Sequence, residues 1–522
     1  MAALLHDLLT ESANRFPDQQ CLVQGGRTVT YAQLLEDGRR VCRLLIGAGV
    51  SPGDRVAVHL DKSIEEATAL VAISMAGAVV VNVNTLLKAR QVRHILEDSG
   101  AETLITSYSR LKTLGAELNG VGRLRTLIGC GSHVQLRAGS VGSFEMIDMC
   151  AAASGPRGDP VRRIDRDIAA ILYTSGSTGL PKGVILSHRN LLAGAESVSA
   201  YLGNTRADRI LSLLPFSFDY GLNQLTTALM VGATLVLKTH LSASDTLKTL
   251  ETERVTGLAG IPTLWSQLLQ ADWAGRTFPD LRYITNSGGR FAEEHVKEYR
   301  RRLPHTRIFL MYGLTEAFRS TYLEPYQVDI RPTSIGKAIP NAEILVVDEV
   351  GRSCGPDEVG ELVHRGAHVA MGYWNDPVLT QQRFRRNPLQ PAGLPVDELV
   401  VFSGDLVRKD EEGYLYYVGR KDHMIKTSGF RVSPTEVEEY FYNTGLVQDV
   451  VAFGVPDPVL GEKIKVALSF RTNVQMGGHE LLAMVSRQMP SFMVPKEIEV
   501  MDNLPKTSSG KIDRPMVCAG RA

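Results

Sequence analysis

The sequence predicts an α/β protein: a large N-terminal domain of mainly parallel sheets with a small β element, followed by a small α+β domain. Three observations support this fold class. Short β-rich apolar runs alternate with amphipathic stretches, which is typical of parallel α/β units. After about residue 340 the pattern changes to short alternating strands between Gly and Pro turns, which favours an antiparallel element. About a hundred residues follow residue 423, enough for a small domain.

The first two thirds of the chain carry the alternating pattern. The N-terminal leucines have helical spacing, so we expect a surface helix there and not a signal peptide. Residues 67–81 are the most apolar stretch, but they are shorter than a membrane span and end in valines. They therefore predict a buried helix that continues into a buried strand. We expect further strands at 55–60, 170–173, 233–238 and 307–312, and helices at 189–202 and 245–253.

The last third of the chain contains the antiparallel element and the small domain. The runs "AEILVVDE", "GELVHRG" and "GYLYYVGR" alternate apolar and polar residues between turns. Further on, Ser433 and Pro434 in "SPTEVEEYF" have the residue types that begin a helix, as cap and first helical residue. We therefore expect an N-terminal domain over 1–421 and a C-terminal domain over 422–522.

Composition excludes several classes of protein. Of the 522 residues, 44% are hydrophobic and 22% are charged, as in ordinary globular proteins. The 57 basic residues balance 57 acidic ones, so nothing indicates a nucleic-acid partner or an anionic membrane surface. The six cysteines are scattered without metal-ligand spacing. We expect a cytoplasmic protein with reduced thiols and no membrane span.

The stretch "ILYTSGSTGLPKGVILSH" (171–188) places small hydroxyl residues, glycines and one lysine directly after an apolar strand. Glycines let a ligand approach the main chain, whereas hydroxyls and the lysine add donors and positive charge. This pattern predicts a polyphosphate site, although Gly and Ser also form ordinary turns. The candidate phosphate ligands are Thr174, Ser175, Gly176, Ser177, Thr178, Gly179 and Lys182.

Two common nucleotide motifs do not fit this loop. Leu180 and Pro181 follow the last loop glycine, so no Gly-Lys-Ser/Thr step opens a helix as in a Walker A motif. The G-x-G-x-x-G dinucleotide pattern is absent as well, which argues against a Rossmann oxidoreductase.

The segment "YTSGSTGLPKG" (173–183) resembles the phosphate-binding loop of the adenylate-forming superfamily. This superfamily includes acyl- and aryl-CoA synthetases, adenylation domains of peptide synthetases, and firefly-type luciferases. Three more segments resemble its motifs in the family's order: "NSGG" (286–289), "MYGLTE" (311–316) and "LPKTSSGKIDR" (504–514). The resemblance covers nearly the whole chain.

The resemblance implies roles for individual residues. Tyr312 corresponds to the ring that stacks on adenine, Thr315 to a phosphate donor and Glu316 to the magnesium-binding carboxylate. Asp405 and Arg420 correspond to the residues that contact the ribose. The resemblance also places Thr174, Ser287, Gly288, Gly289 and Gly313 at the nucleotide.

The implied reaction is attack by a carboxylate on the α-phosphate of ATP, with pyrophosphate as leaving group. Negative charge accumulates, so positioning and electrostatic stabilisation carry the catalysis. Mg²⁺ usually takes one or two protein carboxylates, which suits Glu316. Lys511 resembles the family's C-terminal lysine, and with Glu316 and Thr174 it forms the predicted catalytic set. Asp422 takes the position of the family's hinge residue, which implies that the small C-terminal domain is mobile, and Gly429 takes the position of the thiol tunnel.

The acid pocket is predicted around Phe218, Asp219 and Gly288. Peptide-synthetase domains carry a Phe-Asp pair here whose carboxylate binds the substrate ammonium, whereas long-chain acyl-AMP ligases have His-Asp-Met-Gly with no amine to bind. Asp219 followed by Tyr220 fits either pattern, and a plain capping role is also open. Arg319 could pair with a second carboxylate or with Asp219, although an ordinary structural arginine is the favoured interpretation.

The amino-acid sequences of several segments are similar to those of a bacterial subgroup, the AMP-forming acyl-CoA ligases associated with the exosortase A system. These segments are "PFSFDYGLNQLTTAL" (215–229), residues 284–289, "MYGLTEAFRSTYL" (311–323) and "IKTSGFRVSPTEVEE" (425–439). The resemblance implies an exopolysaccharide or specialised-metabolite setting, with a carrier protein as a possible partner.

The sequence therefore predicts an ATP- and Mg²⁺-dependent acid–thiol ligase. It would form an acyl-adenylate and pass the acyl group to a phosphopantetheine thiol, with CoA as the default acceptor. The main alternative is a stand-alone amino-acid ligase that charges a carrier protein in trans. A luciferase-type oxygenase and a non-enzymatic ATP sensor are the remaining alternatives, and the presence of both Lys511 and Glu316 argues against the sensor.

Overall fold

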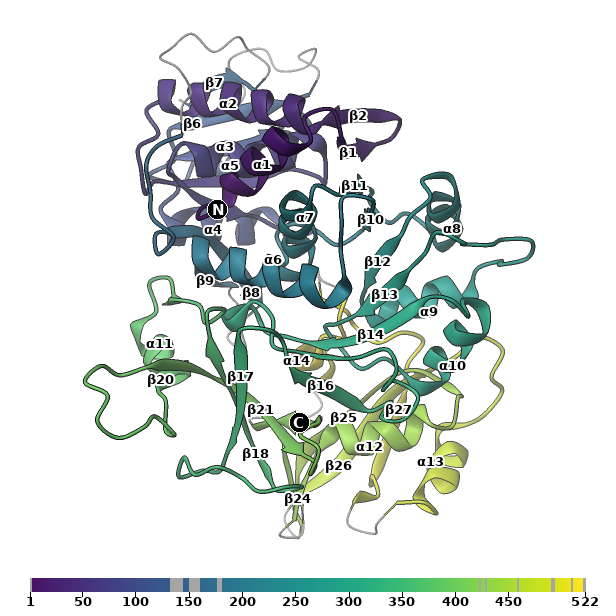
Figure 1. The fold of residues 1–522 in the computed structure, drawn as a ribbon. Coiled ribbons are helices and arrows are strands. Elements are labelled where there is room, and N and C mark those ends of the chain that lie inside the picture. The colour runs from purple at the N-terminus through teal and green to yellow at the C-terminus, as the bar shows by residue number, and fades with distance from the viewer. Residues whose placement is uncertain are drawn as a thin grey trace.

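The computed structural model shows a mixed α/β protein whose strands form three sheets in the described part of the chain (Figure 1). The fold class is confirmed: parallel-rich sheets make up a large N-terminal part, and a smaller domain follows it. The structure describes residues 2–131, 144–149, 160–175, 181–421, 424–427, 430–457, 460–489, 493–507 and 510–519.

An eight-stranded sheet occupies the N-terminal half, in the order β19-β9-β8-β4-β3-β5-β6-β7. Strands β8 to β7 of this order run parallel, whereas β9 and β19 are antiparallel. The expected strands at 55–60 and 170–173 are β3 and β8. The bounds are β3 Arg55–His59, β4 Val79–Asn82, β5 Thr103–Ser107, β6 Thr126–Cys130, β7 Glu145–Asp148, β8 Ile168–Ser175, β9 Pro181–Ser187 and β19 Gly372–Tyr373.

The largest sheet joins two kinds of strand that the sequence shows as separate patterns. Its parallel half runs β14-β13-β12-β10-β11-β1, and its antiparallel half adds β15, β16, β22, β21, β18 and β17 on the β14 side. The antiparallel element is confirmed, and it continues the parallel sheet. The bounds are β1 Gln20–Gln24, β2 Arg27–Thr30, β10 Arg209–Ser212, β11 Thr234–Leu237, β12 Gly257–Gly260, β13 Tyr283–Asn286, β14 Arg307–Tyr312, β15 Thr321–Leu323, β16 Ser334–Ala338, β17 Ala342–Val347, β18 Val359–Gly366, β20 Phe384–Arg386, β21 Leu399–Lys409 and β22 Leu415–Arg420.

The third sheet lies at the C-terminal end, below β14 and α10 in Figure 1. It has its own apolar core, to which α12 and α13 contribute. Ser433 caps α12 by accepting a hydrogen bond from the Glu436 amide, as its sequence predicts. The ion pair between Arg290 and Glu439, 2.5 Å, links this domain to the large one. The bounds are β23 Ile425–Thr427, β24 Phe430–Val432, β25 Val447–Asp457, β26 Gly461–Phe470 and β27 Glu497–Val500.

Two helices, α6 and α7, lie between the two large sheets (Figure 1). The apolar stretch at 67–81 is α3 followed by β4, and both are buried, as expected. No helix among the described residues combines the length and the apolar character that a membrane crossing needs. The helices are α1 Leu5–Arg15, α2 Tyr31–Gly47, α3 Ile64–Met75, α4 Ala89–Ser99, α5 Tyr108–Leu118, α6 His188–Leu202, α7 Asp219–Val231, α8 Ala243–Thr252, α9 Pro262–Gln270, α10 Glu293–Arg302, η2 Thr315–Ala317, α11 Pro377–Arg383, α12 Pro434–Tyr442, α13 Gly478–Ser486 and α14 Arg514–Cys518.

Candidate functional site

Three predicted nucleoside residues lie together where β14, β21 and β22 meet. Asp405 on β21 and Arg420 on β22 are cross-strand partners, and Arg420 Nη1 donates to Asp405 Oδ1 at 3.0 Å. The Tyr312 hydroxyl at the end of β14 donates to the other oxygen of Asp405. Burial raises the pKa of Asp405, and Arg420 and Tyr312 oppose that shift. The group therefore offers a buried, oriented carboxylate beside an aromatic ring.

Glu316, the predicted magnesium ligand, lies four residues beyond Tyr312 in the 3₁₀ turn η2. Tyr373, at the end of β19, donates its hydroxyl to Glu316 Oε1 at 2.5 Å. Burial and the neighbouring carboxylate raise the pKa of Tyr373, which keeps it a donor. One oriented carboxylate fits Mg²⁺, which takes most of its remaining ligands from water and phosphates. The described residues contain no cluster of three or more metal-ligating side chains.

The predicted phosphate loop connects β8 and β9. Thr174 and Lys182 face each other across this hairpin as cross-strand partners, and Ser175 pairs with Pro181 at its end. Gly176, Ser177, Thr178 and Gly179 lie outside the described residues. The structure thus places the two ends of the loop side by side.

Lys511 reaches the large domain from the C-terminal tip. Its Nζ lies 5.5 Å from the centroid of the Phe218 ring. A Cβ placed on Gly288 would lie 3.2 Å from Lys511 Cε, so the lysine passes directly over this glycine. Gly288 has φ +79°, in the left-handed region that favours glycine. Partial removal of water from the Lys511 amine lowers its pKa, whereas the carboxylates of Asp219 and Asp405 raise it.

The predicted acid pocket begins at the N-terminus of α7. Phe218 is the N-cap residue, and Asp219 is the first helical residue and 5% exposed. The nearest guanidinium nitrogen of Arg319 lies 3.8 Å from Asp219 Oδ2. Arg319 also lies over the Tyr220 ring, 4.6 Å from its centroid. Of the partners that the sequence left open for Arg319, Asp219 is the one that the structure places beside it.

The remaining predicted residues surround this centre. Ser287 and Gly289 flank Gly288 in the loop after β13, and the Asn286 side chain donates to the Gly289 carbonyl at 2.9 Å. Gly313 follows the last residue of β14, and Thr315 is the first residue of η2. The hinge residue Asp422 and the tunnel residue Gly429 lie outside the described residues.

Sequence reasoning did not identify Tyr373 as part of the site. This tyrosine lies 57 residues from Glu316 in a "GYW" run that is typical of an ordinary strand end. Its role depends on β19 pairing with β9 at the edge of the eight-stranded sheet, and the sequence gives no spacing that predicts that pairing.

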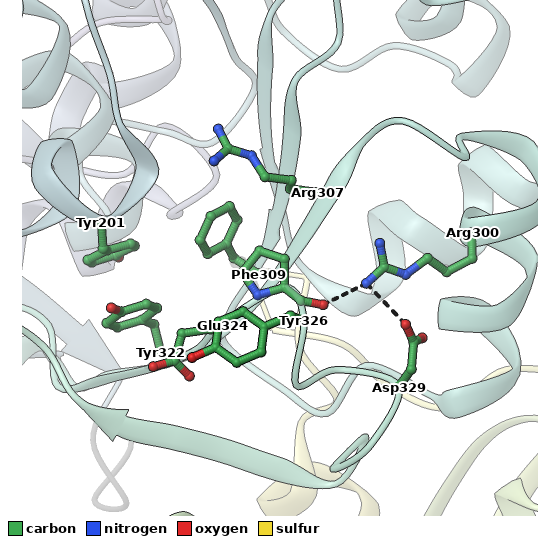
Figure 2. Close-up of a pocket in the computed structure, with 9 residues that line it drawn as sticks. Tyr201, Arg300, Arg307, Phe309, Tyr322, Glu324, Tyr326 and Asp329 are labelled. Atoms are coloured by element: carbon green, nitrogen blue, oxygen red, sulfur yellow. Dashed lines mark hydrogen bonds and ion pairs between the residues drawn. The ribbon is translucent and has the colours of Figure 1, made fainter.

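A separate surface hollow of about 640 Å³ lies near the start of β14 (Figure 2). Its wall includes the stacked rings of Tyr201 and Tyr322, whose centroids are 4.2 Å apart. Figure 2 also shows Arg300 directed toward Asp329 at the rim, 3.5 Å away. None of the predicted site residues lines this hollow, so the candidate site is the one around Gly288 and Lys511.

Two family profiles and many related sequences match the chain that carries this site. A profile described as AMP-binding enzyme matches residues 9–374, and one described as AMP-binding enzyme C-terminal domain matches residues 436–511. A long-chain-fatty-acid–CoA ligase from Escherichia coli O157:H7 is 30% identical over 98% of this chain and 93% of that relative. A linear gramicidin synthase from Brevibacillus parabrevis is 28% identical over 98% of this chain, which corresponds to 9% of that longer protein.

Solved structures share the fold. The o-succinylbenzoate CoA synthetase of Bacillus subtilis, in complex with its acyl-adenylate intermediate, superposes with a TM-score of 0.84 at 26% identity over 98% of this chain and 97% of that one. The same enzyme in complex with ATP and magnesium gives a TM-score of 0.83 at 27% identity over 97% and 98% of the two chains.

Proposed function

The chain belongs to the AMP-binding enzyme family, and from this premise we propose that it joins a carboxylic acid to a phosphopantetheine thiol in two steps. It is an AMP-forming ligase that uses ATP and magnesium, and CoA is the co-substrate of its CoA ligase relatives. In the first proposed step a carboxylate attacks the α-phosphate of ATP and pyrophosphate leaves. In the second a thiol attacks the acyl carbon and AMP leaves. CoA is the default acceptor, and the cytoplasm is the proposed location.

The convergence of Lys511 and Gly288 carries this proposal. Lys511 Nζ lies beside the ring of Phe218, the residue before Asp219, and the carboxylates of Asp219 and Asp405 raise the pKa of the lysine. A cation in this position can bind the attacking carboxylate and the α-phosphate together. Such preorganised charge stabilises a transition state in which negative charge accumulates.

The other predicted residues have supporting positions. We propose that Tyr312, Asp405 and Arg420 hold the nucleoside, and that Thr174, Lys182 and the loop between them hold the phosphates. Glu316 would bind Mg²⁺, which supplies charge neutralisation at the leaving pyrophosphate. The hydrogen bond from Tyr373 keeps the Glu316 carboxylate in one orientation.

The second step needs the thiol to reach the acyl carbon beside Lys511. We propose that the C-terminal domain, 422–522, pivots at Asp422 to withdraw Lys511, and that Gly429 then lines the thiol path. The change of sheet between Arg420 on β22 and Ile425 on β23 supports a pivot in this segment. Hinges are short segments that absorb large backbone changes.

A second candidate acceptor is a carrier protein that acts in trans. The likeness to a linear gramicidin synthase, of which this chain matches 9%, supports this alternative. The buried Asp219 is the corresponding feature of the site, since a carboxylate at this place could hold the ammonium of an amino acid.

A pyrophosphate-release screen tests the function. Fatty, aryl, α-amino, β-amino and short polar acids would be offered with ATP and Mg²⁺, first without an acceptor and then with CoA. We expect acid-dependent pyrophosphate release in the first arm and a CoA thioester in the second. Acid-dependent release without a CoA thioester would favour the carrier protein, whereas no release with any acid would contradict the proposed reaction.

A further inference from the structure

Arg319 is a buried cation with unused hydrogen-bond donors. It is 2% exposed, and its Nε and Nη2 atoms have no partner among the described residues. Its nearest contact with Asp219, 3.8 Å, is too long for a hydrogen bond. A guanidinium stays charged, so donors left empty in this place cost free energy unless a ligand accepts from them.

Arg319 lies beside Gly313, one of the predicted nucleotide residues. A Cβ placed on Gly313 would lie 3.6 Å from the nearest guanidinium nitrogen. Asp219 directly follows Phe218, whose ring faces Lys511. An acid whose carboxylate is at Lys511 would therefore extend its other end toward Asp219 and Arg319.

Behind this pair lies a small cavity whose lining is mostly apolar, with a few polar side chains among it. Asp219, Asn223 and Thr227 follow one another at i, i+4 and i+8 on one face of α7, and all three are buried. Asn223 Nδ2 and Thr227 Oγ1 have no partner in the described chain. They line a cavity of about 20 Å³, which has room for about one water. Such a cavity suits no alkyl chain.

Tyr220 separates this cavity from Arg319. Its ring lies under the guanidinium, and its hydroxyl is fixed by Thr285, with 2.5 Å between the two hydroxyl oxygens. The ring also lines the cavity. This ring therefore closes off the cavity from a substrate that binds the Asp219–Arg319 pair.

The charges of the pair select among polar substrates. An ammonium that binds Asp219 would lie beside the Arg319 cation, and a second carboxylate that binds Arg319 would lie beside the Asp219 anion. A neutral hydroxyl or carboxamide avoids both conflicts, because it can donate to Asp219 and accept from Arg319. Polar groups that both donate and accept are suited to bridge two ions about 4 Å apart.

We propose that the acid is short and carries a neutral hydroxyl or carboxamide group, which binds between Asp219 and Arg319. This inference rests on the proposed acid–thiol ligase function. The proposed acid differs from a long-chain fatty acid in length, and from an amino acid or a dicarboxylate in charge.

The test compares four-carbon acids of similar size and one long-chain acid, dodecanoate. Pyrophosphate release would be measured with butanoate, the 2-, 3- and 4-hydroxybutanoates, succinamate, succinate, 3-aminobutanoate and dodecanoate. We expect kcat/KM for at least one hydroxy or carboxamide acid to exceed that for butanoate by about 10- to 100-fold, as for hydrogen bonds to charged groups. In Arg319→Met, kcat/KM for that acid should fall to the value for butanoate.

A matched control separates recognition from stability. Arg282 donates to buried Asp208 at 2.7 and 2.9 Å, away from the acid pocket. Arg282→Met should lower stability but keep the hydroxyl or amide preference. If Arg319→Met does not fold, Arg319→Lys retains the charge opposite Asp219 and removes the planar donors. Equilibrium binding of 3-hydroxybutanoate and butanoate to the wild type, with a non-hydrolysable ATP analogue, gives a readout without turnover.

Several outcomes would overturn the inference. These are a preference for butanoate, dodecanoate, succinate or 3-aminobutanoate, or a hydroxyl or amide preference that survives Arg319→Met. Each of them leaves the ligase reaction intact, because acid-dependent pyrophosphate release is still observed. Release with none of these acids also contradicts the inference, and the ligase function is then judged on the wider panel described above.

Discussion

The ammonium nitrogen of Lys511 lies 5.5 Å from the centre of the Phe218 ring, which joins the C-terminal tip to the start of α7. This position fits the first half-reaction, because Lys511 also passes over Gly288 and Asp219 directly follows Phe218. We therefore expect substitutions at this centre to impair adenylation more than thioester formation.

Lys511→Ala should lower acid-dependent pyrophosphate release by about 10²- to 10³-fold, the usual loss when one preorganised charge is removed from a transition state. Thioester formation from supplied acyl-AMP should stay close to that of the wild type. Lys506→Ala is the control, since Lys506 lies on the same tip but pairs with Asp449 at 2.9 Å. Equal losses in both half-reactions would contradict this division of roles.

Gly288→Ala should displace Lys511, because the new methyl would lie 3.2 Å from its Cε. We expect pyrophosphate release to fall at least tenfold, together with a loss of stability of about 1 kcal/mol from the left-handed backbone. Gly275→Ala is the matched control, with φ +71° and open space around its Cβ position. It should lose similar stability and keep its activity. Equal activity of the two variants would argue against the contact.

Tyr373→Phe removes the donor that orients Glu316 and keeps the ring. The Mg²⁺ concentration for half-maximal pyrophosphate release should rise about tenfold, as when a residue that orients a metal ligand is lost. Tyr416→Phe is the control, because Tyr416 also donates to a carboxylate, Asp410 at 3.0 Å, outside the site. An unchanged Mg²⁺ dependence in Tyr373→Phe would remove Glu316 from the proposed metal site.

Asp422→Pro should keep acyl-adenylate formation and lose thioester formation, because proline fixes φ at the proposed pivot. The two half-reactions would be followed separately, by pyrophosphate release and by thioester yield. Asp422→Ala, which leaves φ free, should support both. Normal thioester turnover in Asp422→Pro would rule out this residue as the pivot.

Low pH should destabilise the protein through its buried histidines. Burial lowers the pKa of His364 to about 3 and that of His368 to about 4. The unfolded chain then binds more protons than the folded chain between about pH 6.5 and 4, so stability falls as the pH falls. Each histidine contributes about 1.4 kcal/mol per pH unit in that window. Urea unfolding from about pH 7 to 4.5 measures the slope, and His364→Gln should make it shallower.

The sequence predicts much of the site because the family motifs lie at the ends of strands. Tyr312 ends β14, Arg420 ends β22 and Thr174 lies near the end of β8, so local patterns identify both the strand and the residue. The fold class follows from the same alternation of strands and helices.

Partners from distant strands were harder to predict. The contact of Tyr373 with Glu316 depends on β19 joining the edge of one sheet, and the pairing of Arg319 with Asp219 depends on the start of α7 meeting the segment before β15. Neither arrangement has a fixed spacing in the chain. The fusion of the antiparallel strands with the parallel sheet also depends on long-range pairing, which the periodicity of each segment does not encode.

The register of strand β14 limits the insertions and deletions that the chain can accept. Met311 lines the small cavity behind Tyr220, and its neighbour Tyr312 points to the opposite face, where it meets Asp405. Hydrogen bonds to β13 and β15 fix this register on both sides. A one-codon insertion or deletion within the strand would exchange the two faces and disrupt the packing behind Tyr220 together with the nucleoside end of the site. We therefore expect length variants among descendants of this chain to be found in its loops and excluded from β14.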